Sequence, residues 1–484
     1  MQDVRKFTFD VGWVLVGSGI ALVIGFALRP VLARWLGAED LGLYSMVLTI
    51  QGVASLLTSV GIPVALTKYV AEEKNTKDKL SQTITAAFIS SIITGLLVGL
   101  ILYVLSGIFA SLFHMPDLAR LLKILAFSLP FNSILQIVLG LFTGLRQMKT
   151  YTLLTVLQNL LMTSSALILV WLGCGVDGAI WAIVFSAAGS CILGLYFSRK
   201  YLRTNFAGLF QGIKRLALFG SQVFGANALN LVLIYTDTLM IGYFMYDKDV
   251  GYYSIAISIA AILGIVPIAI QTITYPATSQ YWAQDGHKSL GIMIDKSMKY
   301  STCILLLLGL VIGFFSKELI TLVFGQGYSL AVLPLIVLII ARVGSITLPV
   351  GASFSGAGRP DIVLKLSACQ AVLNLVLNFL LIPPFGILGA SIATATTFLI
   401  GTAVHLILMP KILKVRVDIK WFVKTMGLAC IAIALFLVGR EFINYYIVGG
   451  VILCAYTMLI PTVFLTSEDR YTLKSLAYSV VHRR

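Results

Sequence analysis

The stretch Ala38–Ser45 (AEDLGLYS) has a near copy at Asp247–Ser254 (DKDVGYYS). An aspartate, a glycine, a tyrosine and a serine match at one constant offset. Two further pairs of similar segments follow in the same order, about 210 residues apart. They are Phe142–Gly144 with Phe354–Gly356, and Gly175–Ala182 with Gly386–Ala393. Three ordered matches at nearly the same spacing indicate an internal duplication, and this duplication decides the architecture.

The composition of the chain points to lipid as its solvent. Of its 484 residues, 59% are hydrophobic and only 11% are charged, whereas soluble domains carry about 25% charged residues. Apolar stretches of about 20 residues recur along the sequence, each long enough to cross a hydrocarbon core of about 30 Å. The first of them, near Val11, is too long for a signal peptide and is predicted to be a retained helix. We therefore expect an all-α polytopic membrane protein.

The hydropathy pattern predicts about fourteen membrane-spanning helices. The predicted spans are 11–34, 41–64, 83–105, 121–141, 153–172, 179–197, 218–241, 252–276, 300–315, 330–350, 362–381, 387–409, 421–438 and 445–464. The expected organisation is an N-terminal six-helix lobe (1–205), a C-terminal six-helix lobe (206–412), and two extra helices with a tail (413–484). Six helices per repeat give both lobes one orientation, so we expect pseudo-symmetric lobes about an axis along the membrane normal, with the substrate path between them.

Basic residues predict the orientation of the chain in the plasma membrane. Roughly 26 Lys and Arg residues fall on one side of the predicted spans and about 7 on the other. The side with more basic residues holds both termini, so both are predicted to be cytoplasmic. This asymmetry also accounts for the net charge of +15. A nucleic-acid partner is therefore not expected.

A charge inside a membrane span costs several kcal/mol unless it is paired or hydrated. Four of the charged residues inside the predicted spans stand out, namely Arg29, Asp237, Arg342 and Lys365. Arg29 and Asp237 occupy nearly equivalent places in the two repeats. Arg29, together with Arg34, could bind an anionic headgroup in bidentate form. Asp237 could neutralise the arginine when no substrate is bound, or carry a proton or cation. The alternative is a static Arg29–Asp237 pair that only fixes helix packing.

The other charged and polar candidates lie mainly in the second repeat. Arg342 and Lys365 lie nearer the predicted cytoplasmic ends of their helices, where they could snorkel to the headgroups or form a basic cavity mouth. Carboxamide side chains share helix faces, and could bind sugar hydroxyls or other helices. These residues are Asn227 and Asn230 on the seventh predicted span, Gln271 on the eighth, and Gln370, Asn374 and Asn378 on the eleventh.

The sequence offers no sign of catalysis. It contains no nucleophile–base pair, no cluster with metal-ligand spacing and no phosphate-binding glycine loop with its lysine. No catalytic residue, metal site or cofactor is therefore predicted. The six cysteines are scattered without metal or redox spacing. Transport, if it occurs, is expected not to be driven by ATP hydrolysis within this chain.

Several of these segments carry a family resemblance. Leu32–Tyr44 (LARWLGAEDLGLY), Phe354–Pro360 (FSGAGRP) and Asn374–Thr394 resemble the polysaccharide-exporter branch of the MOP flippase superfamily, whose members include Wzx-like oligosaccharide flippases. The resemblance covers nearly the whole chain. It implies a MOP/MATE-like fold, a basic cavity between lobes, and translocation of a polyprenyl-pyrophosphate-linked oligosaccharide from the cytoplasmic leaflet by alternating access. Membrane lipid and polysaccharide-assembly proteins are the further expected partners.

Three other functions remain open from the sequence. A cation-coupled multidrug exporter of the related multidrug branch is the main alternative, although that branch usually stops at about twelve helices. A membrane-embedded polymerase or glycosyltransferase would need a long extracytoplasmic loop or paired carboxylates. A structural scaffold is the third.

Overall fold

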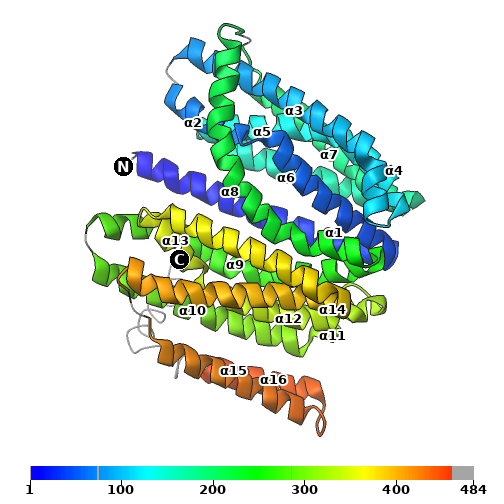
Figure 1. Ribbon diagram of the computed structural model, residues 1–484, viewed down its shortest axis with the longest axis vertical. Coiled ribbons are helices and arrows are strands. Elements are labelled where there is room, and N and C mark those ends of the chain that lie inside the picture. The colour runs from blue at the N-terminus through cyan, green and yellow to red at the C-terminus, as the bar shows by residue number, and fades with distance from the viewer. Residues whose placement is uncertain (1, 74–75, 204, 285, 416, 460–484) are drawn as a thin grey trace, which may run out of the picture. The chain divides into compact units, whose positions relative to one another are not determined.

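The computed structural model describes residues 2–73, 76–203, 205–284, 286–415 and 417–459, and every regular element in these ranges is a helix (Figure 1). The first half comprises α1 (Gln2–Ser59), α2 (Ile62–Glu73), α3 (Lys77–Leu112), α4 (Pro116–Ala126), α5 (Ser128–Gly144), α6 (Met148–Leu169), η1 (Val170–Cys174) and α7 (Gly175–Ser198). The second half comprises α8 (Leu209–Phe244), α9 (Asp247–Ala283), α10 (His287–Phe314), α11 (Ser316–Val323), η2 (Gln326–Ala331), α12 (Val332–Gly344), η3 (Ser345–Thr347), α13 (Leu348–Gly356), α14 (Pro360–Ile412), α15 (Ile419–Gly439) and α16 (Tyr445–Leu459). The end of the last predicted span and the predicted tail, residues 460–484, lie outside the described residues.

The predicted polytopic all-α fold is confirmed. Eight described helices, or ten if each bent helix pair is counted as one span, are long and apolar enough to cross a membrane. Three of these stretches, Gly12–Ser59, Met148–Ser198 and Pro360–Ile412, contain 48, 51 and 53 residues. Each is long enough for two spans of about 20 residues, and each is broken by glycine near its middle. With these three counted double and the shorter helix α16 added, the described residues account for the fourteen predicted spans.

Helix α3 illustrates how a single helix faces both lipid and protein. Its exposed face carries large apolar side chains at helical spacing, which suits contact with acyl chains. The opposite face carries Gly95 and Gly99, four residues apart. A Cβ on Gly95 would lie 2.9 Å from Pro130 Cα, and one on Gly99 would lie 3.0 Å from Ala126 O. Small residues thus let α3 pack closely on α4 and α5, as membrane helices require.

The matched segments adopt the same backbone geometry in both repeats. Gly175 has φ 55° and ψ −144°, and its counterpart Gly386 has φ 58° and ψ −138°. Both values lie in a region that is nearly restricted to glycine. After the second pair of motifs, the amide of Gln147 donates to Phe142 O at 2.8 Å, and that of Arg359 donates to Phe354 O at 2.9 Å. Such matched bonds close the same helix C-terminal turn, so the duplication extends to three dimensions.

The described residues form two compact units. The first contains those of Met1–Ser254, Val323–Tyr328 and Asn378–Ile387, and the second contains those of Ile255–Leu322, Ser329–Leu377 and Leu388–Arg484. In the first unit, α8 bends by 44° between Leu209–Gly225 and Asn227–Phe244. In the second, α15 and α16 pack on α10, and the rings of Phe314 and Phe436 stack at 4.1 Å. The predicted lobe boundaries at residues 205 and 412 stay a prediction.

Candidate functional site

The centre of the candidate site is a buried carboxylate on α8. Asp237 is only 2% exposed. One of its oxygens accepts a hydrogen bond from the Tyr253 hydroxyl at 2.5 Å, and the other accepts one from Asn378 Nδ2 at 2.7 Å. These donors come from α9 and α14, so three helices meet at one charge. Two donors offset part of the free-energy cost of burying a carboxylate, which would otherwise be several kcal/mol.

Arg29 also contacts the beginning of α9. It is half-buried on α1, and its Nη1 lies 3.5 Å from the carbonyl oxygen of Ser254, the residue after Tyr253. Its guanidinium also interacts electrostatically with Tyr44. Tyr44 and Tyr253 are equivalent in the duplication. In each repeat, therefore, the charged residue of the first helix lies near the same tyrosine of the second, and in the second repeat a hydrogen bond joins the two.

Arg34 lies one turn beyond Arg29 and is exposed. Its Nε donates to Val323 O at 3.1 Å. Beside it, the Tyr328 hydroxyl donates to Ala33 O at 2.7 Å. The segment Val323–Tyr328 therefore fastens to this end of α1. The predicted role of Arg34 in binding a headgroup stays a prediction.

The predicted carboxamide face of α14 is partly used within the protein. Asn374 and Asn378 are both buried, and Asn374 Nδ2 donates to Thr394 Oγ1 at 3.3 Å. The Gln370 amide packs against Gly401, where a Cβ would overlap it. These contacts join the two segments of α14 on either side of its break at Gly386, and they support the alternative that the amides serve helix packing. Asn378 lies beside Asp237.

The remaining predicted residues are spread over both units. Asn227 and Asn230 are exposed on α8, whereas Gln271 is half-buried on α9. Arg342 is half-buried on α12, and its guanidinium carbon lies 5.8 Å from the centre of the Phe398 ring. Lys365 is exposed near the start of α14. Asp237 and Asn378 are predicted residues that the structure brings into direct contact.

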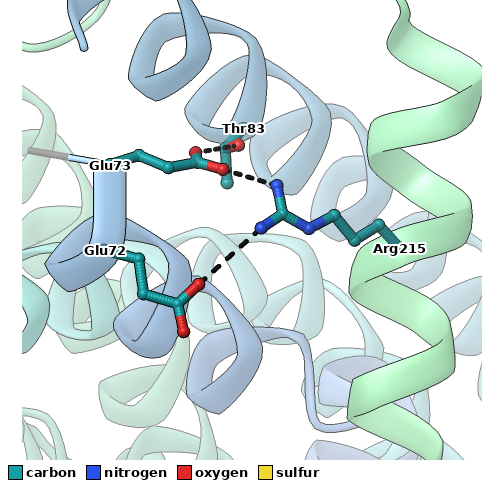
Figure 2. Close-up of polar contacts among 4 residues, drawn as sticks. All are labelled: Glu72, Glu73, Thr83 and Arg215. Carbon is teal, nitrogen blue, oxygen red and sulfur yellow. Dashed lines mark hydrogen bonds and ion pairs between the residues drawn. The ribbon is translucent and has the colours of Figure 1, made fainter.

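A second polar cluster joins α2, α3 and α8 (Figure 2). Glu73 is buried at the end of α2; one oxygen lies 2.5 Å from Arg215 Nη1, and the other accepts a hydrogen bond from Thr83 at 2.7 Å. Arg215 also lies over the Tyr69 ring at 3.8 Å and reaches Glu72 at 3.8 Å. Close by, a Cβ on Gly220 would overlap the carbonyl oxygen of Val60. The first half of α8, before its bend, is therefore held to α2 and α3.

At Arg359, between α13 and α14, a surface ion pair fixes the turn. Its Nε and Nη2 donate to the two oxygens of Asp361 at 3.0 and 3.1 Å. This bidentate bond raises the pKa of the Arg359 guanidinium above its ordinary value. Arg359 lies in one of the segments that carry the family resemblance, so this cation is held in a fixed direction at the predicted cytoplasmic end.

The second unit contains a cavity of about 710 Å³ between α10, α12 and α15. Its walls are mainly aliphatic and aromatic, and include Ile336, Ile340 and Phe436. One end carries charged residues, among them Lys317 and Arg440. An apolar cavity with a charged end suits an amphipathic molecule.

Several of these residues were not predicted as candidates from the sequence. In the sequence, Tyr253 stands out only as part of the repeat and Thr394 only as the end of a matching segment, and Glu73 carries no signal. Arg215 is one of the basic residues whose distribution predicts the orientation of the chain. A buried partner on a distant helix leaves no spacing signal in the sequence. The one available signal was the recurrence of a tyrosine at positions 44 and 253.

Comparison with known proteins agrees with this fold. A relative from Haloferax volcanii, named "Probable low-salt glycan biosynthesis flippase Agl15", is 23% identical over 381 residues, which is 77% of each chain. The structure of the lipid II flippase MurJ in an inward closed conformation matches with a TM-score of 0.77 and 13% identity, over 92% of this chain and 98% of that one. An inward-facing MATE-family multidrug resistance transporter of the MOP superfamily matches with a TM-score of 0.63 and 14% identity, over 83% and 98%. The fold is therefore that of the MOP superfamily.

Two family models match the sequence. The model described as MatE matches residues 223–380. The model described as "Polysaccharide biosynthesis protein" matches residues 7–282, which is more than half of the chain. With a polytopic helical fold, a duplicated core and this match, the protein belongs to the polysaccharide biosynthesis protein family.

Proposed function

We propose that this protein is a flippase that moves a polyprenyl-pyrophosphate-linked oligosaccharide across the plasma membrane by alternating access, for the synthesis of a surface glycan. Membership of the polysaccharide biosynthesis family supports this assignment. So do the names of the proteins it resembles, which include a glycan flippase and a lipid II flippase. Transport of this kind does not require a catalytic residue in this chain.

The observation that carries the proposal is the half-buried Arg29 within the predicted span 11–34. A guanidinium in this position needs an anionic or polar partner. A pyrophosphate presents oxygens that Arg29 can bind in bidentate form. The sugar portion would need hydrogen-bonding groups along the path, and the exposed amides Asn227 and Asn230 on α8 can supply them. Arg34, Arg342, Lys365 and Gln271 are the further proposed contacts.

Coupling is assigned to Asp237. A carboxylate buried between three helices changes its interactions with Tyr253 and Asn378 whenever it gains a proton or a cation. Such a change can bias the packing of α8 against α9 and α14. We propose that this event drives rocking of the lobes 1–205 and 206–412, with both termini in the cytoplasm. Polysaccharide-assembly proteins are the proposed partners on the outer side.

Reconstitution tests the function directly. The purified protein is placed in liposomes that contain a fluorescent polyprenyl-pyrophosphate oligosaccharide, and a membrane-impermeant quencher reports on translocation. The expected result is faster loss of protected fluorescence than in liposomes that contain Arg29→Ala. Equal rates in liposomes with and without the protein would overturn the proposal.

A multidrug exporter is the second candidate, because the MatE family model matches residues 223–380. That function predicts resistance to cationic drugs when the protein is overproduced. Resistance that is lost in Asp237→Asn, without glycan translocation in liposomes, would favour the exporter. Translocation without resistance would favour the flippase.

A further inference from the structure

The cavity of about 710 Å³ in the second unit opens towards the surrounding lipid. Gly309 and Gly313 on α10 line it, and their missing side chains leave room between α12 and α15, which both pack on α10 or lie beside it. The walls include Leu333 on α12 and Leu437 on α15, which are 62% and 47% exposed. Apolar side chains that stay this exposed in a membrane-spanning chain face acyl chains. An acyl chain can therefore enter the cavity from the side.

The cavity occupies only one end of the helices that form it. It is lined on α10 from Gly309 onwards and on α15 from Ile433 onwards, close to where each helix ends. The longest helical stretch along it, Val332–Ile340 on α12, rises about 13 Å. This is less than half of a hydrocarbon core of about 30 Å. A cavity this short cannot accompany a lipid from one leaflet to the other, so it fits a lipid that stays in one leaflet.

Charged side chains gather at the end of the cavity where α10 and α15 end. Lys317 and Arg440 carry positive charge there, and Glu318 and Glu441 carry negative charge. Tyr445 lines the same end and donates its hydroxyl to Glu318 Oε1 at 2.9 Å. Lysine, arginine and tyrosine side chains are typical of the headgroup depth of a bilayer. This end therefore lies at the level of the headgroups, on the predicted extracytoplasmic side.

The charges at this end are complementary to a zwitterionic headgroup. Two cations and two carboxylates cancel, so an anionic headgroup would meet as much repulsion as attraction. Arg440 Nε lies 3.5 Å from Glu441 Oε1, and the two side chains are 50% and 69% exposed. Such an exposed pair contributes little to stability. Both side chains can therefore exchange this contact for a headgroup, the arginine binding a phosphate and the glutamate an amine.

We propose that this cavity binds a resident phospholipid with a zwitterionic amine headgroup, of the phosphatidylethanolamine type, in the predicted outer leaflet. One acyl chain fills the space that Gly309 and Gly313 leave between α12 and α15. The phosphate contacts Lys317 and Arg440. The bound lipid joins α15 to α10 and α12, and it stays in its leaflet. Its binding does not depend on the proposed function.

Photo-cross-linking tests the site. The purified protein is placed in nanodiscs of phosphatidylglycerol that contain a small fraction of phosphatidylethanolamine with a diazirine on one acyl chain, and mass spectrometry maps the cross-links. They are expected on the cavity-lining stretches of α12 and α15. Gly313→Leu should reduce them at least about tenfold, because a Cβ there meets only Ile339 Cδ1, at 3.9 Å, and the leucine fits into the cavity. The matched control is Gly107→Leu on α3, where a Cβ meets nothing within 4 Å.

Competition on the unaltered protein covers the chance that Gly313→Leu does not fold. Unlabelled phosphatidylethanolamine, as the bulk lipid in place of phosphatidylglycerol, is expected to lower cross-linking at least about tenfold. Lys317→Gln/Arg440→Gln should remove most of this preference. Cross-linking that is the same in both bulk lipids, or the same in Gly313→Leu and Gly107→Leu, would overturn the proposal. So would displacement of the probe by undecaprenyl pyrophosphate at a lower concentration than by phosphatidylethanolamine, because the cavity would then belong to the transported lipid.

Discussion

Tyr253 donates its hydroxyl hydrogen to the buried carboxylate of Asp237 at 2.5 Å, while the next residue, Ser254, presents its carbonyl oxygen to Arg29 at 3.5 Å. Two consecutive residues of α9 therefore connect the acidic and the basic residue that occupy nearly equivalent places in the duplication. A change at either charge is therefore expected to act on the same turn of α9. The two charges therefore share this contact with α9, in addition to their other partners.

Asp237→Asn is expected to slow translocation at least about tenfold and to flatten its dependence on pH or on added Na⁺. Asparagine keeps the shape of the side chain but cannot gain a proton or hold a cation by charge, and a lost hydrogen bond to a charged group costs about 1.5–3 kcal/mol. Liposome translocation measured over a series of pH values and Na⁺ concentrations checks this. Tyr253→Phe, which keeps the charge, should slow transport but retain the ion dependence. An unchanged profile in Asp237→Asn would make this carboxylate structural.

Arg29→Ala is expected to abolish glycan export while the protein still inserts into the membrane. The arginine supplies a fixed cation within a predicted membrane span, and alanine leaves no positive charge at this position. Arg29→Lys should keep part of the activity, because it retains the charge but loses the bidentate geometry. Surface glycan is measured by complementation of a flippase-deficient strain, with the membrane content of each variant determined in parallel. Normal surface glycan in Arg29→Ala would exclude its proposed role.

The sequence predicted the helices and the duplication, because apolar length and ordered motifs are one-dimensional signals. It also placed Asp237 and Asn378 among the candidates, since polar groups are costly in lipid. The partners of these groups could not be read in the same way. Tyr253 and Asp237 come from different helices, and an amphipathic tyrosine in an apolar helix is common without any such role. Which residues pair depends on how each helix is rotated about its own axis. Several faces of these helices are equally apolar, so the sequence does not determine that rotation.

The Glu73–Arg215 pair is expected to stabilise the first half of α8 against α2 and α3 (Figure 2). Glu73→Gln should lower the free energy of unfolding by about 1 kcal/mol, a modest value because Arg215 is 47% exposed and water screens the pair. Glu72→Gln is the matched control, since Glu72 is 51% exposed and lies 3.8 Å from the same arginine; its effect should stay within about 0.5 kcal/mol. Denaturation in detergent micelles measures both.

Reversal of the charges sharpens this test. Glu73→Arg alone places two cations together at the end of α2 and should destabilise the protein more than Glu73→Gln does. The double variant Glu73→Arg/Arg215→Glu should recover part of that loss, because opposite charges again face each other. A double variant that is no more stable than Glu73→Arg would show that the pair makes no net contribution.

Gly175→Ala and Gly386→Ala are both expected to destabilise the protein, because the duplication gives both residues the same backbone geometry. At φ 55° and 58°, an alanine Cβ meets its own backbone, which costs about 1–3 kcal/mol. Gly386 should be the more sensitive of the two, since its added Cβ also lies 3.1 Å from Met245 Cε, whereas nothing lies within 4 Å at Gly175.

Gly107→Ala on α3 is the control. Its Cβ meets nothing within 4 Å and its φ is ordinary, so this variant should gain about 0.5–1 kcal/mol of stability. Thermal unfolding in a single detergent shows which variants are less stable than the parent protein and which are more stable. A Gly175→Ala protein as stable as Gly107→Ala would mean that the break between α6 and α7 does not depend on glycine, and that the shared geometry of the repeats is set by their tertiary packing instead.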